Sequence, residues 1–166
     1  MAYHSSVASS GLPSLGRRGE GWVIAQAVLL GLVAVGEVLG PPWPRPIAHV
    51  LLLPGLILLA AGALLFVAGI VALGQALTPL PLPRDRASLR EGGAYGLVRH
   101  PIYGGAILMI AGWSLIATPV GLAMTALVGI FFELKSRREE EWLVARYAGY
   151  EDYRGRVRWK FLPGLS

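Results

Sequence analysis

Three long runs of apolar residues dominate the chain. The first covers residues 21–39 and carries one charge, Glu37, and the second covers residues 47–77 with no charge. The third covers residues 102–134, where the only charge is Glu133 near its end. A helix needs about 20 mostly apolar residues to cross the hydrocarbon core of a bilayer, so the pattern predicts membrane-spanning helices.

The third run contains a strong helix breaker, because residues 117–121 read Ala-Thr-Pro-Val-Gly. We expect two short crossings joined there as a tight hairpin, each about 24 Å long at ~1.5 Å per residue. One crossing followed by a buried or re-entrant piece is the alternative. The predicted fold class is therefore an all-α membrane protein with about four transmembrane helices, the last two forming the hairpin, and a cytoplasmic C-terminal amphipathic helix.

The apolar runs also set the expected domain boundaries. The predicted crossings cover residues 21–39, 49–74, 102–117 and 119–135. We expect residues 21–166 to form a single integral-membrane domain, preceded by a flexible N-terminus over residues 1–20. No small-residue cleavage site follows the first run, so we expect it to be retained rather than removed as a signal peptide.

The positions of the basic residues predict the orientation of these helices. The chain carries 15 Lys and Arg residues against 10 Asp and Glu, which gives a net charge of +5. With four crossings, fourteen of the fifteen basic residues lie on the same side as both termini, and Arg45 lies on the other. Because cytoplasmic loops are rich in Lys and Arg, we expect both termini in the cytoplasm of a multi-pass protein in the cell inner membrane. This arrangement explains the basic charge without a nucleic-acid partner.

Composition narrows the chemistry further. A chain that is 54% hydrophobic and 15% charged is typical of a membrane protein rather than of a soluble domain. The absence of cysteine excludes disulfides, thiolate metal sites and a cysteine nucleophile. The three histidines, His4, His49 and His100, lie in separate segments without metal-ligand spacing, so we expect no metal.

Two features inside the apolar runs concern helix packing. Glycines recur every seven residues in the second run, at Gly55, Gly62 and Gly69. This spacing puts them near one face of a helix and predicts close approach of a neighbouring helix. Glu37 is an ionisable group inside a span and hence a functional candidate, but its place beside Trp43 and Arg45 favours pairing at the membrane interface.

The other polar residues concentrate in segments 78–103 and 133–160, both on the predicted cytoplasmic side. If the crossings bundle, these segments meet over one membrane face and cover a pocket open to water and to lipid. The first segment ends in Arg-His-Pro-Ile-Tyr at 99–103, where proline at a helix start leaves free N–H groups suited to a carboxylate or phosphate. A juxtamembrane anchor, with Arg99 at lipid headgroups and Tyr103 in the interfacial belt, explains the same spacing equally well.

The second segment is expected to continue the last crossing as a charged helix. Arg137 stands four residues from both Glu133 and Glu141, so a solvated salt-bridge face is the alternative to a functional role for the glutamates at 139–141. Apolar and aromatic residues also recur here at intervals that suit an interfacial anchor or the cover of a pocket. These residues are Trp142, Leu143, Tyr147, Tyr150, Tyr153, Val157 and Phe161.

Four elements in this half of the chain occur together at a characteristic distance. They are Leu-Gly-Gln-Ala-Leu-Thr-Pro at 73–79, Gly-Ala-Tyr-Gly-Leu-Val-Arg-His-Pro-Ile-Tyr-Gly-Gly at 93–105, Glu-Glu-x-x-Leu at 139–143, and Tyr-Glu-Asp-Tyr-x-x-x-Val at 150–157 ahead of Phe-Leu-Pro at 161–163. Arg-His-Pro-x-Tyr alone is moderately specific, and the whole set is strong. With these elements the sequence resembles the membrane-embedded isoprenylcysteine carboxyl methyltransferases and the related phospholipid methyltransferases.

The resemblance implies methyl transfer from S-adenosylmethionine to a lipophilic or small acceptor at the cytoplasmic membrane face. By position, it implies that the cofactor site consists of Leu89, Arg90, Tyr95, Arg99, His100, Pro101, Ile102, Tyr103, Glu139 and Glu140. The catalytic candidates are His100, Glu140 and Lys135. Lys135 stands where the prenylcysteine enzymes carry a substrate-facing arginine, and this difference argues against a bidentate clamp on a prenylcysteine carboxylate.

Two other functions fit parts of the pattern. NADPH-dependent membrane reductases of the sterol type carry a related motif, usually Arg-His-Pro-Asn-Tyr, and Ile102 in place of that asparagine favours the methyltransferase. A non-catalytic small membrane protein would leave the polar cluster unexplained. The bilayer and a lipophilic or small-molecule acceptor are thus the expected partners.

Overall fold

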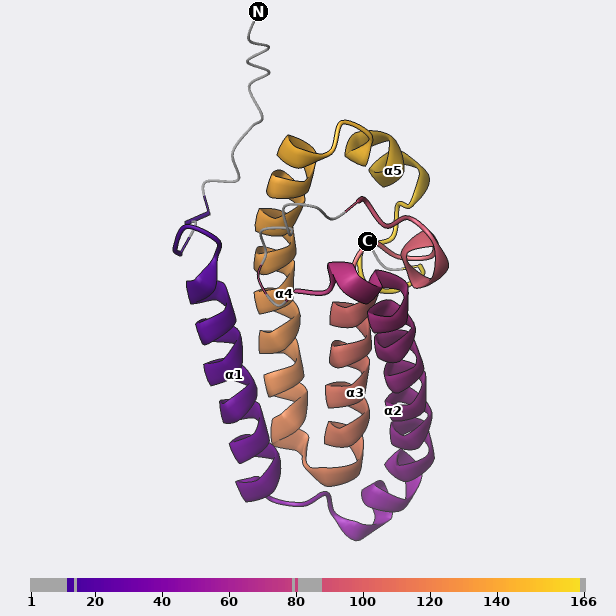
Figure 1. Ribbon diagram of the computed structural model, residues 1–166. Helices are drawn as coiled ribbons and strands as arrows, with labels where there is room; N and C mark the ends of the chain where they lie inside the picture. Colours follow the sequence, from indigo (N-terminus) through magenta and orange to yellow (C-terminus); the bar gives the residue numbers. More distant parts are fainter. Residues whose placement is uncertain (1–11, 14, 79, 81–87, 165–166) are drawn as a thin grey trace, which may run out of the picture.

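The computed structural model describes residues 12–13, 15–78, 80 and 88–164, and the regular structure in these ranges is helical (Figure 1). The long helices are α1 (Glu20–Leu39), α2 (Arg45–Leu73), α3 (Pro101–Ala117) and α4 (Pro119–Arg146). The short ones are η1 (Gly74–Ala76), η2 (Gly93–Gly96) and α5 (Tyr150–Arg156). The predicted all-α fold is confirmed. The N-terminus over residues 1–20 was predicted to be flexible. Residues 1–11 and 14 of this segment lie outside the described ranges.

Within the described ranges, three helical segments are long and apolar enough to cross a membrane. They are Glu20–Leu39, Arg45–Ala76 and Pro119–Arg146. Helix α3 is also apolar but has only 17 residues. Helices α1, α2 and α3 begin and end within about four residues of the bounds predicted for the first three crossings, because apolar runs and prolines mark these ends locally. Helix α4 begins at the predicted Pro119 and continues past residue 135 to Arg146.

The predicted hairpin forms at the breaker in the third apolar run. Helix α3 ends at Ala117 and α4 begins at Pro119, so Thr118 alone joins them. The Thr118 hydroxyl accepts a hydrogen bond from the Val120 N–H at 3.3 Å and donates one to the Pro41 carbonyl at 2.8 Å. Proline fits the first turn of α4 because its missing N–H would have no helical partner there.

The glycines of α2 form the predicted packing seam, and α3 is the helix that fits against it. Gly55, Gly62 and Gly69 are all buried. A Cβ on Gly62 would lie 2.7 Å from the Gly105 carbonyl oxygen, and one on Gly55 would lie 2.8 Å from the Gly112 carbonyl oxygen. Small residues on both helices thus let the two backbones approach closely, which fixes where α3 begins.

Helix α1 packs mainly on α4, so the order across the bundle is α1, α4, α3, α2 (Figure 1). Val33 of α1 joins Val128 and Phe132 of α4 in a buried cluster. Glu37 was predicted to pair at the membrane interface, close to Trp43 and Arg45. Its Oε1 instead accepts a hydrogen bond from the Ser114 hydroxyl at 2.5 Å, because the side chain points inward toward α3.

Beyond α4 the chain folds back over one end of the bundle. The segment predicted as an amphipathic C-terminal helix consists of the last turns of α4, the seven residues of α5 and an irregular stretch after Arg156. Backbone hydrogen bonds run from the Arg99 N–H to the Trp159 carbonyl at 3.0 Å and from the His100 N–H to the Lys160 carbonyl at 2.8 Å. The C-terminal stretch therefore holds the start of α3 in place.

We expect Gly62→Ala to lower the free energy of unfolding by about 1–3 kcal/mol, because its Cβ would meet the backbone of α3. Thermal unfolding of the detergent-purified protein measures this. Gly31→Ala is the matched control, since no atom lies within 4 Å of a Cβ at that position. If the two substitutions lowered the free energy of unfolding equally, close packing of α2 against α3 at Gly62 would be contradicted.

Candidate functional site

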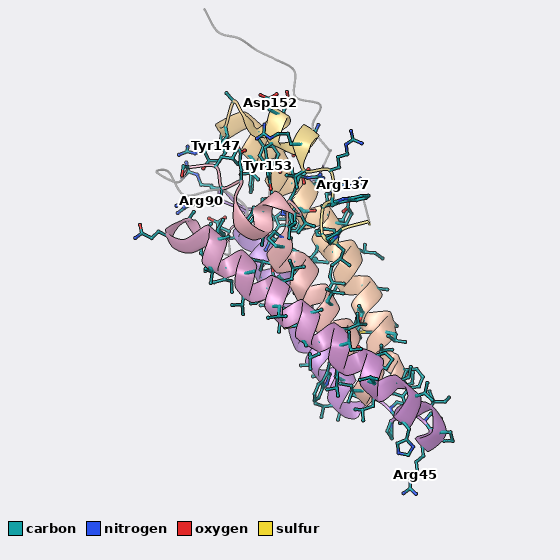
Figure 2. All side chains as sticks on the ribbon, turned by 90° about the vertical axis from the view of Figure 1, so that its right-hand side faces the viewer. Arg45, Arg90, Arg137, Tyr147, Asp152 and Tyr153 are labelled. Atoms are coloured by element: carbon teal, nitrogen blue, oxygen red, sulfur yellow. The ribbon has the colours of Figure 1, made fainter. Side chains whose placement is uncertain are left out.

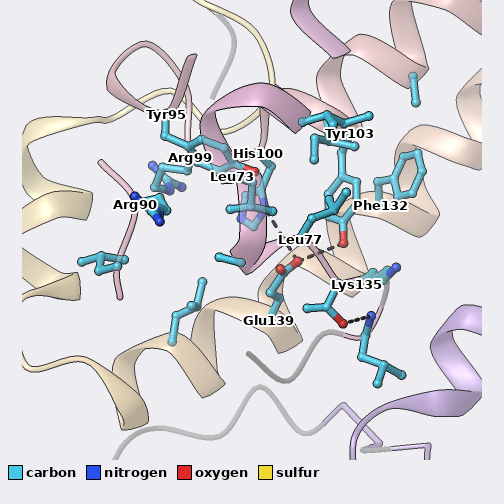
Figure 3. Close-up of a pocket in the computed structure, with 18 of the residues that line it drawn as sticks. Leu73, Leu77, Arg90, Tyr95, Arg99, His100, Tyr103, Phe132, Lys135 and Glu139 are labelled. Atoms are coloured by element: carbon cyan, nitrogen blue, oxygen red, sulfur yellow. Dashed lines mark hydrogen bonds and ion pairs between the residues drawn. The ribbon is translucent and has the colours of Figure 1, made fainter. Parts of the chain in front are cut away.

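A cavity of about 410 Å³ lies where the membrane helices meet the polar loops and α5 (Figure 3). Ligand pockets commonly measure about 300–1,000 Å³, so the space suits a small molecule. Apolar side chains from all four long helices form much of its wall. The polar groups come from the loop before α3, from the start of α3, from α4 and α5, and from Gln26 of α1.

His100 precedes Pro101, the first residue of α3, and its ring is held between two glutamates of α4. Its Nε2 lies 3.0 Å from Glu140 Oε1, and its Nδ1 lies 3.7 Å from Glu139 Oε2. The ring also stacks on Tyr103 with 5.4 Å between centroids. His100 makes no side-chain cap to the helix, and the side chains of Ile102 and Tyr103 in the first turn of α3 line the cavity.

Glu140 forms the centre of a buried ionic cluster. Its Oε1 accepts hydrogen bonds from Arg99 Nε at 2.9 Å and from His100. The Arg99 guanidinium also donates to the carbonyls of Val157, at 3.0 Å, and Arg158, at 2.6 Å. Burial raises the pKa of the Glu140 carboxyl, but the hydrogen bonds and charges of His100 and Arg99 outweigh burial and hold that pKa at about 2.

Glu139, the residue before Glu140, is more exposed and lies at the cavity wall. Its Oε2 accepts a hydrogen bond from the Tyr103 hydroxyl at 2.9 Å. The side chain is 24% exposed, compared with 10% for Glu140, and it lines the cavity. Glu139 is thus the carboxylate that a bound ligand can reach.

Tyrosines from the loop and from α5 cover the cavity. The Tyr153 hydroxyl donates to the Tyr95 carbonyl at 2.8 Å, and Arg156 pairs with Glu91. Burial raises the pKa of Tyr95 and Tyr150, so both hydroxyls keep their protons at neutral pH. In the part of the chain that the structure describes, the buried Tyr150 hydroxyl has no hydrogen-bond partner.

The far side of the cavity is formed by Lys135 and Gln26. Lys135 is 1% exposed, and its Nζ donates to Gln26 Oε1 at 2.5 Å. The same Nζ lies 5.2 Å from the centroid of the Tyr103 ring. Tyr103 in turn stacks on Phe132 with 4.5 Å between centroids. A positive charge therefore lies at the end of the cavity that faces α1.

The structure brings most of the predicted site residues together. Those that line the cavity are Leu89, Arg90, Tyr95, Arg99, His100, Ile102, Tyr103, Lys135 and Glu139. Pro101 is buried in the first turn of α3, and Glu140 lies behind His100, so neither reaches the cavity wall. Arg99 is 10% exposed and pairs with Glu140. This contradicts the interpretation of Arg99 as an anchor to lipid headgroups.

The charged face of α4 forms separately from the cavity. Arg137 Nε pairs with Glu133 at 2.7 Å as predicted. Glu141, which was also predicted to pair with Arg137, pairs with Arg138 at 2.6 Å from three residues away. The predicted solvated salt-bridge face is therefore present at Glu133 and Arg137. Glu139 and Glu140 do not belong to it, because they contact Tyr103, His100 and Arg99.

Gln26 is not among the predicted site residues, because it lies inside the first apolar run. It is the one amide or charged side chain among residues 21–36, and this isolation was the available signal. The cavity also takes Phe66 and Ile70 from α2. Apolar residues of this kind carry no individual signal in a span, because every face of such a helix is apolar.

A known protein family covers this region of the chain. A family model described as phospholipid methyltransferase matches residues 50–149, more than half of the 166 residues. The range includes the motifs at 73–79, 93–105 and 139–143 and stops before Tyr150. Searches of curated proteins and of solved structures gave no match. The resemblance predicted from the motifs is confirmed, the apolar helices fit an integral membrane protein, and the chain belongs to the phospholipid methyltransferase family.

Proposed function

We propose that this protein transfers a methyl group from S-adenosylmethionine to a lipophilic acceptor at the cytoplasmic face of the membrane. The observation that carries the proposal is the cavity between the membrane helices and the polar loops, with Glu139 and His100 in its wall. The family match supports methyl transfer as the reaction.

Four crossings with both termini in the cytoplasm fit this function. Helix α3 would cross as the shorter arm of its hairpin with α4, about 25 Å long at ~1.5 Å per residue. Local thinning of the bilayer accommodates such a helix. Arg90, Arg137 and Asp152 lie at one end of the bundle and Arg45 at the other (Figure 2). This asymmetry of the arginines supports the proposed orientation. We also propose that residues 21–166 form one integral-membrane domain in the cell inner membrane.

The residues of the cavity fit S-adenosylmethionine chemically. The Glu139 carboxylate suits an ammonium or ribose hydroxyls, and the uncapped N-terminus of α3 suits a carboxylate. The buried Tyr150 hydroxyl, which has no partner in the described ranges, would gain one from a bound ligand. Leu89, Arg90 and Tyr95 border the same space from the loop.

When bound, S-adenosylmethionine supplies a methyl group on a sulfonium sulfur. The acceptor's lone pair forms the new bond to the methyl carbon, and the electron pair of the broken carbon–sulfur bond stays on sulfur. The protein mainly has to align the two partners and exclude water. Stacked Tyr103 and Phe132 form a rigid wall for this alignment, and the tyrosines of the cover exclude water.

A carboxylate acceptor needs no base, whereas an amine or alcohol must lose a proton. His100 or Glu139 would then take it, since both line the cavity. Glu140 acts as a positioning residue, because its carboxylate holds His100 and Arg99. Lys135 faces the acceptor from the α1 side.

Thermal unfolding in detergent tests the proposed cofactor directly. A ligand that binds the native state raises its apparent stability, so we expect S-adenosylmethionine and S-adenosylhomocysteine to raise the unfolding temperature and NADPH to leave it unchanged. A shift with NADPH and none with either sulfur compound would instead favour a membrane reductase.

We expect Glu139→Gln and His100→Ala each to abolish stabilisation by S-adenosylhomocysteine while the protein remains folded. Glu139→Gln removes the charge that meets the ligand, and His100→Ala opens the wall at the start of α3. Glu151→Gln, on the exposed face of α5, is the matched control and should respond like the wild type. Full stabilisation of both site variants would contradict the assignment.

We expect the buried cluster to respond to pH in a defined window. The folded-state pKa of Glu140 is about 2, below its ordinary value of 4.5, so its contribution is complete above about 4.5 and lost as the pH falls toward 2. Glu140→Gln should lower stability by roughly 3 kcal/mol at pH 5, because it leaves Arg99 buried without its partner. This difference from wild type, measured by denaturation, should shrink below pH 4.5. A difference already absent at pH 5 would contradict the ionic cluster.

A further inference from the structure

A basic cluster lies outside the cavity, where the C-terminal stretch meets α4. Glu133 Oε1 lies 2.7 Å from Arg137 Nε and 2.9 Å from Lys160 Nζ. Two cations share this single carboxylate, so the three side chains keep a net charge of +1. None of the three lines the cavity. The remaining positive charge is therefore directed at something other than the ligand of the cavity.

Arg137 has the hydrogen-bonding capacity to use this charge. Its side chain is 58% exposed, and only its Nε donates to Glu133. Within the described part of the chain, its two terminal guanidinium nitrogens have no partner. A guanidinium with free terminal N–H groups suits a phosphate, to which it can donate two hydrogen bonds at once.

The residues just before Lys160 extend the cluster along the chain. Arg158 is exposed, and its side chain forms no hydrogen bond or ion pair among the residues that the structure describes. Trp159 is also exposed. Tryptophan is enriched where membranes meet water, because its amphipathic ring lies at the level of the lipid headgroups.

The cluster lies where the apolar surface of α4 ends. Leu127, Ile130 and Leu134 are exposed apolar residues of this helix, and Arg137 follows them. Their spacing of three or four residues puts all four on one helix face. This face changes from apolar to cationic at Arg137, at the polar end of the bundle (Figure 2). A lipid presents the same order of groups, with its acyl chains below its headgroup.

We propose that an anionic phospholipid docks on this surface, with its phosphate at Arg137 and an acyl chain along the exposed face of α4. The net positive charge selects an anionic head, and the apolar residues next to it suit the chain. With the orientation proposed above, this is the cytoplasmic leaflet, which carries the anionic lipids. The lipid lies outside the cavity, so the proposal does not depend on the methyl-transfer reaction.

The docked lipid also acts on the cover of the cavity. Through the basic cluster it attaches the C-terminal stretch to the bilayer. The carbonyls of Trp159 and Lys160 in this stretch accept hydrogen bonds from the backbone N–H groups of Arg99 and His100. Binding of the lipid therefore stabilises the segment that holds the start of α3, and it raises the unfolding temperature.

Three probes separate the contributions of the head and the chains. Dioleoylphosphatidylglycerol has a net negative head and two chains, dioleoylphosphatidylcholine has the same chains without net charge, and glycerol phosphate has the charge without chains. Each is added to the full chain in a non-ionic detergent, and the rise in unfolding temperature is measured. We expect phosphatidylglycerol to act at a roughly tenfold lower concentration than either other probe. Added salt should reduce this advantage.

Variants locate the lipid on the surface. Arg137→Gln should weaken the apparent binding of phosphatidylglycerol roughly fivefold, and Arg158→Gln should weaken it in the same direction. Arg45→Gln is the matched control, because it removes the same charge from an exposed arginine at the other end of the bundle (Figure 2). Without lipid, all three variants should unfold near the wild-type temperature, since exposed charges contribute little to stability.

Three results would overturn the proposal. Equal stabilisation by phosphatidylglycerol and phosphatidylcholine would show that the surface does not select the charge of the head. A response to glycerol phosphate at the same concentration as to phosphatidylglycerol would show that the chain does not bind to α4. If Arg45→Gln weakened the binding of phosphatidylglycerol as much as Arg137→Gln and Arg158→Gln, the lipid would be responding to the net charge of the protein rather than to this surface.

Discussion

The site depends first on one interaction, the ionic contact of Glu140 with Arg99 and His100. It joins the last turns of α4 to the residues just before α3, where a buried carboxylate without partners would be costly. Successive residues on a helix are separated by about 100°, so fixing Glu140 also fixes the direction of Glu139. One glutamate is thereby used for structure, and its neighbour is left at the cavity wall. Glu140 thus has a structural role, and Glu139 is available to a ligand.

The position of α3 is fixed from two further directions. Glycines of α2 bring its backbone close along the seam, and the C-terminal stretch hydrogen-bonds the backbone at Arg99 and His100. Both contacts hold the start of α3 beside the cavity, which Ile102 and Tyr103 line. The membrane helices and the C-terminal stretch therefore both contact the start of α3, near Arg99 and His100. In this way a chain of 166 residues can form such a site.

Much of the fold was predictable because its signals are local. Apolar runs, prolines and the glycine spacing set the helix bounds and the seam, and the motif around His100 indicated the site. What the sequence could not show were choices among tertiary partners. The Ser114 hydroxyl donates a hydrogen bond to Glu37, and Arg138 pairs with Glu141. Gln26 reaches Lys135 across more than a hundred residues, a contact that no local pattern encodes.

The central claim is methyl transfer from S-adenosylmethionine to a lipophilic acceptor. Its most direct test reconstitutes the full chain in vesicles that contain a membrane lipid extract and supplies S-adenosylmethionine with a tritiated methyl group. We expect tritium in the fraction extracted by organic solvent, at a rate that falls to background in the Glu139→Gln variant. An extract that gains no tritium from the wild type, or gains it equally from the variant, would contradict the account.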